Sequence, residues 1–229
     1  MNQKTPSGCR ISDPDPKHFR IVIPAKGNSR RAPGKNQQLL PMTLDYVSHL
    51  DLLDKSWVMT DSPSLTALAV DRGVHVLPEV QVGDDFTVNF TASYRHAGWD
   101  DETPIILLEP TKPLREEWLL EHCLRQHFLT GKTVCTGLED EMTLLEWLDG
   151  RPHRRPRMRI LDACVVVSRC GEFSKFTNMN AFWEYQECEV VWHKAPTGID
   201  FDWPVDLRTH LPTVRRLLEN GCYVESRYE

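Results

Sequence analysis

The feature that most constrains this chain is a repeated alternation of short apolar segments with segments of helical periodicity. The run at 20–25 is rich in β-branched residues and bounded by turn formers, as expected for a strand buried on both faces of a parallel sheet. Apolar residues at helical spacing follow at 42–53. Alternation of this kind predicts an α/β fold with a mostly parallel sheet covered on both faces. Further strands are expected at 57–59, 74–77, 104–108, 133–136, 163–167 and 188–192, and further helices at 62–72, from after Asp85 towards Trp99, at 114–129 and from about 204.

Ligands of open parallel sheets bind just beyond the carboxyl ends of the strands, where loops of different strands meet. In this chain such loops follow Ala25, Met59 and Leu108. We therefore expect the three loops to line one shared cleft, and their polar residues are the first candidates for a functional site.

The loop at 26–36 is the strongest candidate, because it places four cations and two glycines directly after a buried strand. Glycines allow the backbone to approach a ligand closely, and exposed backbone N–H groups bind anions. Lysine and arginine neutralise a triphosphate and stabilise the charge that develops during transfer. The loop lacks the Gly-Lys-Ser/Thr ending of a Walker loop. A solvated basic loop is the alternative, but the position at the end of a strand favours phosphate binding.

Asp200 and Asp202 form the second candidate. Residues two apart on an extended segment point the same way, so both carboxylates can reach one Mg²⁺ ion. Such an ion would bridge phosphate oxygens and hold a triphosphate for in-line attack. Equally, Asp202 is suited to capping the helix expected from Pro204.

Polar residues also follow two other expected strands. Glu109, Thr111 and Lys112 cluster in a proline-containing turn, and a simple helix start does not explain that clustering. Thr60 and Asp61 follow the strand at 57–59, where they are suited either to ligand contact or to capping the next helix.

Composition limits the partners and the compartment. A formal net charge of −6 argues against general nucleic-acid binding, because no basic excess exists to neutralise phosphates. No segment approaches the ~20 apolar residues of a membrane helix, and residues 1–17 read as a flexible leader without the apolar core of a signal peptide. The seven cysteines are scattered, with no pair spaced for zinc or redox chemistry. We therefore predict a cytoplasmic protein with one domain at 18–229 and no membrane contact.

Together these segments resemble the CMP-sialic acid synthetase (acylneuraminate cytidylyltransferase) family of nucleotidyltransferases. That family opens with Pro-Ala-Arg-Gly-Gly-Ser-Lys-x-x-Pro-x-Lys-Asn, and residues 24–36 match it with Lys26, Asn28 and Arg30 as substitutions. Its Ser/Thr-Asp occurs here at 60–61 and its Gln-Pro-Thr-Ser-Pro-Leu-Arg at 109–115. Its Ile-Asp-x-x-x-Asp-Leu ending appears as Ile-Asp at 199–200 and Asp-Leu at 206–207. Each motif is weak alone, but their order and spacing across nearly the whole chain are jointly specific.

The resemblance implies a Rossmann-like, three-layer α/β/α nucleotidyltransferase fold, usually dimeric, that uses Mg²⁺. The implied reaction moves CMP from CTP to an acidic, nonulosonate-like sugar and releases pyrophosphate. The strand and helix pattern loosens at about 139–187, which we interpret as a small excursion from the sheet with strands for a homodimer contact. Carried over residue by residue, the catalytic group is Lys26, Arg30, Lys35 and Asp202; the nucleotide contacts are Pro24, Ala25, Gly27, Asn28, Ser29, Asn36, Thr60, Asp61 and Asp84; the acceptor contacts are Glu109, Thr111, Lys112 and Arg115; and the metal ligands are Asp200 and Asp202.

Departures from the family pattern keep the substrates open. The family's Arg-Pro after the third strand, with its arginine near the base, is Leu77-Pro78 here. Glu109 and Lys112 replace an uncharged glutamine and serine near the acceptor, and Glu109 is also suited to the metal site, as is an acidic residue near this place in the related KDO cytidylyltransferases. The alternatives are a nucleotidyltransferase for another base or for a non-sugar acid such as a phosphonate, and a catalytically inactive nucleotide-binding protein.

Overall fold

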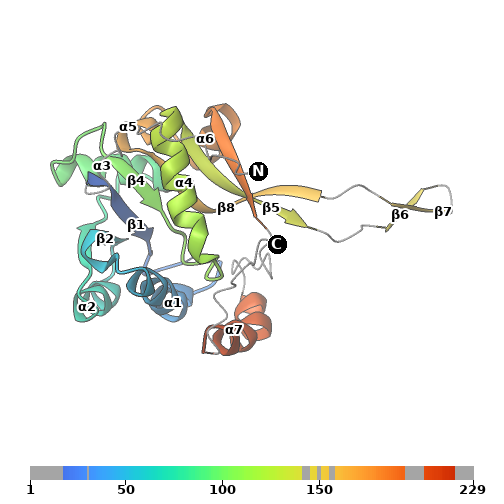
Figure 1. The fold of residues 1–229 in the computed structure, drawn as a ribbon. Helices are drawn as coiled ribbons and strands as arrows, with labels where there is room; N and C mark the ends of the chain where they lie inside the picture. Colours follow the sequence, from blue (N-terminus) through green and yellow to red (C-terminus); the bar gives the residue numbers. More distant parts are fainter. Residues whose placement is uncertain are drawn as a thin grey trace, which may run out of the picture.

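The computed structural model describes residues 18–29, 31–140, 145–148, 151–154, 158–193 and 204–219. Strands and helices alternate through the first half of this part, as expected (Figure 1). The strands are β1 (Arg20–Pro24), β2 (Ser56–Thr60), β3 (His75–Pro78), β4 (Pro104–Leu107), β5 (Thr133–Asp140), β6 (Leu145–Leu148), β7 (Arg151–Arg154), β8 (Met158–Arg169) and β9 (Cys188–His193). The helices are α1 (Lys35–His49), α2 (Pro63–Asp71), α3 (Phe86–His96), α4 (Glu117–Thr130), α5 (Cys170–Phe173), α6 (Met179–Tyr185) and α7 (Pro204–Glu219), with a 3-10 turn, η2 (Leu53–Lys55), before β2.

Seven of the strands form one sheet in the order β3-β2-β1-β4-β8-β5-β9. Strand β1 pairs in parallel with β2 and β4, β2 with β3, and β5 with β9. Only β8 runs antiparallel to its neighbours, β4 and β5. The predicted mostly parallel sheet is therefore confirmed, and the carboxyl ends of β1, β2 and β4 meet at one edge of it.

Side chains alternate across β1 and supply two separate cores. Ile21 and Ile23 lie in a core with residues of α1, α2 and α4, such as Leu44. Val22 faces the opposite core, where Phe90 of α3 and Phe182 of α6 are buried. Because successive residues of a strand face opposite sides, this division means that helices cover both faces of the sheet. The result is the expected α/β/α arrangement of three layers.

Helix α1 begins at Lys35, well before the predicted start at 42, so that part of the prediction is wrong. Gly34 turns the chain into the helix with φ 75°, a conformation that carries no steric penalty for glycine. Pro41 lies inside the helix and removes a backbone hydrogen bond, at a cost of about 3 kcal/mol. Leu39 and Leu40 are fully buried beside it, and each such burial contributes roughly 1.5–3 kcal/mol. Packing thus outweighs the proline.

Strands β5 and β8 are longer than predicted, because they pair with each other past the point where the pairing of β8 with β4 ends. Their antiparallel pairing continues as far as Asp140 opposite Met158. Strands β6 and β7 form a separate antiparallel pair, which Figure 1 shows beyond β5 and β8 and away from the main body. Helices α5 and α6 also fall within the excursion expected at about 139–187, yet Phe173 and Phe182 bury them against the sheet.

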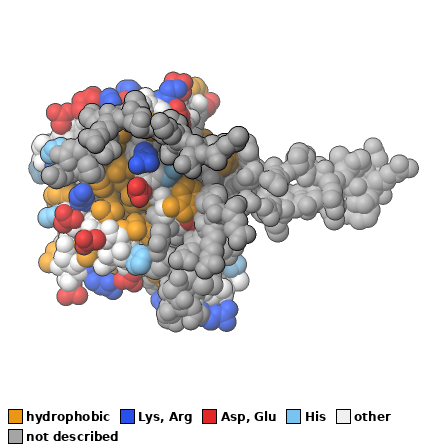
Figure 2. All heavy atoms as spheres, in the orientation of Figure 1, with side chains coloured by type: hydrophobic (Ala, Val, Ile, Leu, Met, Phe, Trp, Pro, Cys, Tyr) orange, Lys and Arg blue, Asp and Glu red, His pale blue; other side chains and the backbone are white. Residues whose placement is uncertain are grey.

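Within the described ranges, no helix is long and apolar enough to cross a membrane. On the face drawn in Figure 2, acidic and basic side chains are interspersed, and hydrophobic side chains gather toward the middle.

Candidate active site

A cavity of about 680 Å³ lies at the carboxyl ends of β1, β2 and β4. All three loops that were expected to meet there contribute to its wall, so the predicted shared cleft is confirmed. Its charged lining side chains include three cations and four carboxylates. The lining residues are Pro24, Ala25, Lys26, Asn28, Ser29, Arg31, Lys35, Asn36, Met59, Asp61, Glu79, Gln81, Asp84, Phe86, Leu107, Glu109, Pro110, Thr111 and Met179.

Close packing and two hydrogen bonds shape the loop at 26–36. A Cβ atom at Gly27 would lie 2.6 Å from the Cβ atom of Ser62, so only glycine fits between this loop and the start of α2. The Gly27 N–H donates to Asp61 Oδ1 at 2.8 Å, and the Asn36 side-chain amide donates to the Lys26 carbonyl at 2.7 Å. Asp61 and Asn36 therefore hold the loop in position as well as lining the cavity.

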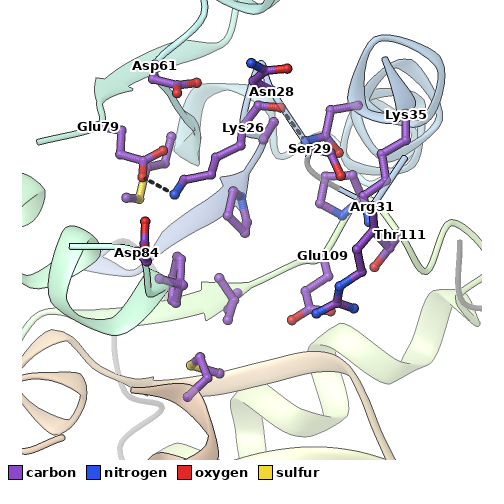
Figure 3. A pocket seen from close by; sticks show the side chains of 18 of the residues that line it. Lys26, Asn28, Ser29, Arg31, Lys35, Asp61, Glu79, Asp84, Glu109 and Thr111 are labelled. Atoms are coloured by element: carbon purple, nitrogen blue, oxygen red, sulfur yellow. Dashed lines mark hydrogen bonds and ion pairs between the residues drawn. The ribbon is translucent and has the colours of Figure 1, made fainter. Parts of the chain in front are cut away.

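Cations and a helix N-terminus make one part of the cavity suitable for a polyanion. Lys35 is the first residue of α1 and is 8% exposed. Figure 3 shows Arg31 and Lys35 on the same side of the cavity, with Arg31 extending toward Glu109. The first turn of α1 adds backbone N–H groups and the positive end of the helix dipole.

Lys26 meets a carboxylate on the other side of the cavity. Its Nζ atom lies 3.3 Å from Glu79 Oε1, and Figure 3 shows the two side chains extending toward each other. The Glu79 side chain is 4% exposed, and the same Oε1 accepts a hydrogen bond from Asn89 Nδ2 at 2.8 Å. The lysine predicted to hold phosphate is thus paired in this structure with a buried carboxylate.

Lys112 and Arg115, both predicted to contact the acceptor, are not among the residues that line the cavity. Lys112 Nζ contacts the Asp162 carbonyl and lies 3.4 Å from Glu109 Oε2. Arg115 is buried, which lowers its pKa, and it donates to the carbonyl oxygens of Cys164, at 3.0 Å, and Glu109. Both side chains stabilise the 109–115 turn behind the cavity wall.

The remaining predicted residues divide in the same way. Thr60 is 3% exposed, and its Oγ1 accepts a hydrogen bond from the Ser62 N–H at 3.1 Å in the turn before α2, so it neither lines the cavity nor caps the helix. Asp84 and Thr111 line the cavity, as do most of the residues predicted from the first loop, whereas Gly27 does not: the loop residues that line it are Pro24, Ala25, Lys26, Asn28, Ser29, Lys35 and Asn36. Arg30, Asp200 and Asp202 lie outside the described residues, so their roles stay predictions.

Several lining residues were missed by the sequence reasoning. Two of them, Glu79 and Gln81, are polar residues in the loop after β3, where polar residues are expected to line the same cleft, and Phe86 is the first residue of α3. Met179 arrives from α6, where its N–H donates to Asp85 Oδ1 at 3.0 Å; that oxygen also caps α3 through the Thr87 N–H at 2.9 Å. No local pattern signals a contact over such a separation. The missed residues are Arg31, Met59, Glu79, Gln81, Phe86, Leu107, Pro110 and Met179.

A second polar cluster lies behind the 109–115 turn. His193 Nε2 is 2.9 Å from Asp162 Oδ2 and 3.8 Å from Cys164 Sγ, and its Nδ1 is 3.9 Å from Glu116 Oε2. Asp162, Cys164 and His193 offer potential metal-ligand atoms within 4.8 Å of one another, the one such group found within the described part. Burial would lower the pKa of His193 and raise that of Asp162, but their hydrogen bond outweighs it and shifts the two values to about 10 and about 2. These shifts favour an imidazolium–carboxylate pair, beside which burial raises the pKa of Glu116.

No family model matches this chain. It is 34% identical over 107 residues to a 3-deoxy-manno-octulosonate cytidylyltransferase of Xanthomonas oryzae, covering 44% of this chain and 41% of the relative. It is 28% identical over 121 residues to an N-acylneuraminate cytidylyltransferase of Streptococcus agalactiae, covering 46% and 28%. It is 30% identical over 129 residues to a CMP-N,N'-diacetyllegionaminic acid synthase of Legionella pneumophila, covering 49% and 54%. The match thus spans about half or less of each relative's length.

Solved structures resemble the chain over much more of its length. A CMP:2-keto-3-deoxy-manno-octonic acid synthetase complexed with CTP superposes with a TM-score of 0.64 at 18% identity, covering 89% of this chain and 99% of that one. A 4-diphosphocytidyl-2C-methyl-D-erythritol synthase superposes with a TM-score of 0.61 at 14% identity, covering 88% and 99%. The chain therefore has the α/β nucleotidyltransferase fold. Within that class its sequence relatives are cytidylyltransferases, and the resemblance to the CMP-sialic acid synthetase family that the motifs indicated is confirmed.

Proposed function

We propose that this chain is a cytidylyltransferase, which moves CMP from CTP to an acidic, nonulosonate-like sugar and releases pyrophosphate. The observation that supports this most is the meeting of Lys26, Arg31 and Lys35 in one cavity at the carboxyl edge of a mostly parallel sheet. Such a cavity suits a triphosphate. The names of the relatives supply the nucleotide and the class of acceptor.

The proposed reaction is a substitution at phosphorus. The acceptor hydroxyl oxygen attacks the α-phosphorus, and the bond from that phosphorus to the oxygen bridging to the β-phosphate breaks. Pyrophosphate leaves with that oxygen and its electron pair, and the hydroxyl proton is released to water. Lys26, Arg31 and Lys35 would neutralise the charge that grows on the leaving phosphates, which lowers the barrier more than it strengthens binding.

We also propose Mg²⁺ as the cofactor. The cavity lining has one more carboxylate than cations, so these residues alone do not offset the charge of a triphosphate. Carboxylate oxygens are the ligands that Mg²⁺ prefers, and Asp200 and Asp202 are the predicted ligands. When held by these two carboxylates, the ion would supply the positive charge that the cavity lining lacks toward a triphosphate.

We further propose that the protein is a cytoplasmic homodimer. A homodimer through the arm of β5, β8, β6 and β7 is supported by its projection from the main body (Figure 1). A reducing, cytoplasmic compartment is supported by the free thiols of Cys123, Cys135, Cys164, Cys170 and Cys188.

Pyrophosphate release tests the proposal directly. Each of the four nucleoside triphosphates is incubated with Mg²⁺ and with N-acetylneuraminate, 3-deoxy-manno-octulosonate or a simple phosphonate. We expect release only with CTP, a sugar acid and Mg²⁺. Release with another nucleotide or with the phosphonate would replace the substrate assignment. Nucleotide binding without release from any mixture would leave a catalytically inactive nucleotide-binding protein.

A further inference from the structure

Glu79 is a buried carboxylate whose hydrogen-bonding capacity is only half used. It lines the cavity from the loop after β3, with its side chain 4% exposed. Oε1 takes both contacts already described, from Asn89 and from Lys26. Oε2 makes no hydrogen bond to any residue of the described ranges. Glu79 Oε2 is therefore a hydrogen-bond acceptor at the cavity that can receive a donor from a ligand.

Asn89 holds this carboxylate in a fixed orientation. The Asn89 side chain is fully buried, and its Oδ1 accepts from the N–H groups of Val82, at 3.0 Å, and Gly83, at 2.9 Å. Its Nδ2 donates to Glu79 and also to the Gly83 carbonyl at 3.0 Å. The Glu79 N–H is bonded to the Thr60 carbonyl at 3.0 Å. The side-chain amide of Asn89 thus uses both of its N–H donors and both lone pairs of its oxygen. Rotating the Glu79 carboxylate would therefore break hydrogen bonds that hold the loop at 79–83.

Two other acidic groups of the cavity, Asp61 and Glu109, are engaged differently. Asp61 Oδ1 holds the Gly27 N–H, and Glu109 lies beside Lys112, which does not line the cavity and so keeps its place when a ligand enters. Glu79 instead shares Lys26, a cation that a triphosphate would attract. As Lys26 turns to phosphate, the buried carboxylate loses its counter-charge, and an unpaired buried charge is costly. A hydrogen-bond donor on the same ligand would compensate the Glu79 carboxylate for the loss of Lys26.

We propose that Glu79 forms a base-reading site, in which its carboxylate accepts a hydrogen bond from the exocyclic amine of cytosine and selects CTP over UTP. This inference rests on the proposed function for the identity of the nucleotide. Cytosine presents an N4 amine where uracil presents the O4 acceptor, so a carboxylate binds the first and repels the second. Phe86 lines the same cavity, its ring stacked on Phe90 with centroids 5.4 Å apart, and offers a flat apolar surface for the base.

The test compares CTP with UTP in Glu79→Gln, which keeps the shape of the side chain and an oxygen for Asn89. Dissociation constants without acceptor and kcat/KM for pyrophosphate release are measured with both nucleotides. We expect the preference for CTP over UTP to fall about ten- to a hundredfold, as for loss of a hydrogen bond to a charged group. Asp61→Asn is the matched control. It removes the charge of another cavity carboxylate, and it should change the binding of CTP and UTP by the same factor.

An unchanged CTP-to-UTP ratio in Glu79→Gln, with both nucleotides weakened together, would overturn the proposal and leave Glu79 as a partner that orients Lys26. A second measurement on the parent protein does not depend on the folding of the variant. The triphosphate of 2-pyrimidinone riboside lacks the N4 amine, and we expect it to bind about ten- to a hundredfold more weakly than CTP; equal binding would refute the reading of the amine. The binding ratios are independent of catalysis, so absent pyrophosphate release would reject the proposed function without deciding this inference.

Discussion

Replacing Asp162 by asparagine removes the counter-ion of a histidine in the interior of the protein. The His193 side chain has no exposed surface and that of Asp162 is 17% exposed, with Nε2 and Oδ2 2.9 Å apart. Asparagine keeps the shape of the side chain and loses its charge. The variant therefore isolates what the ion pair contributes to the free energy of unfolding.

The magnitude follows from the pKa of Asp162. Burial opposes the shift, but the hydrogen bond and charge of His193, together with hydrogen bonds from Thr136 and the Cys164 N–H, lower this pKa from 3.8 to about 2. At about 1.4 kcal/mol for each pH unit, these contacts together contribute roughly 2.5 kcal/mol near neutral pH, most of it from His193. The rise of the His193 pKa from 6.5 to about 10, to which Cys164 also contributes, would give a larger figure, so the smaller figure from Asp162 is taken for the pair. We expect Asp162→Asn to lower the free energy of unfolding by about 2–3 kcal/mol.

The pH dependence has a definite sign on each side. The folded pKa of Asp162 is depressed, so its contribution is present above its unfolded value of 3.8 and is lost as the pH falls toward 2. The folded pKa of His193 is raised, so its contribution is complete below 6.5 and is lost as the pH rises toward 10. The pair therefore contributes most between about pH 4 and pH 6.5, and the variant should lack both slopes.

Urea unfolding followed by tryptophan fluorescence at pH 3, 6 and 9 measures this. A double-mutant cycle with His193→Gln should give a coupling of about 2–3 kcal/mol at pH 6. Asp45→Asn is the control, because Asp45 forms an exposed ion pair with Arg72 at 2.6 Å, which should contribute less than about 1 kcal/mol. A coupling below about 0.5 kcal/mol, with parallel pH profiles for parent and variant, would refute the reasoning.

Three further substitutions test the site and the backbone. Lys35→Ala should weaken CTP binding and slow transfer about ten- to a hundredfold, measured by calorimetry and kcat/KM, whereas Lys175→Ala, which removes an exposed ion pair with Glu172, should change neither; unaltered CTP binding in Lys35→Ala contradicts the assignment. Gly27→Ala forces its Cβ to 2.6 Å from that of Ser62, so CTP affinity should fall at least about tenfold with little change in Tm, and parental affinity would show that the loop adapts. Ala163 adopts φ 49° and is buried, so Ala163→Gly relieves a strain of about 1–2 kcal/mol but costs about 0.5–1 kcal/mol of chain entropy and about 0.8 kcal/mol for the lost buried methyl group; the free energy of unfolding in urea should stay within about 1 kcal/mol of the parent value, and a loss above about 2 kcal/mol would contradict this.

The main sheet was predictable because its strands are buried on both faces and their apolar runs interrupt helical periodicity. The same physics explains the errors. Pro41 hid the first turns of α1, since a local pattern cannot register the burial of Leu39 and Leu40 by distant residues. The full length of β5 and β8 could not be predicted from local patterns, because each strand is stabilised by pairing with the other, which lies beyond an intervening segment.

The site was less predictable than the sheet, because a motif identifies residues by type and spacing but does not show what each side chain contacts. Thr60, Lys112 and Arg115 belong to motifs, yet their side chains form hydrogen bonds with backbone groups behind the cavity wall. Glu79 belongs to none of the motifs, yet its side chain is buried at the cavity and its Oε2 can accept a further hydrogen bond. A residue that only maintains the wall can be exchanged if the turn keeps its shape, whereas a group facing the ligand alters which substrate is taken. Differences in substrate between this chain and its relatives should therefore be sought first in lining residues outside the motifs, and Glu79 is the one whose charge most needs a ligand to explain it.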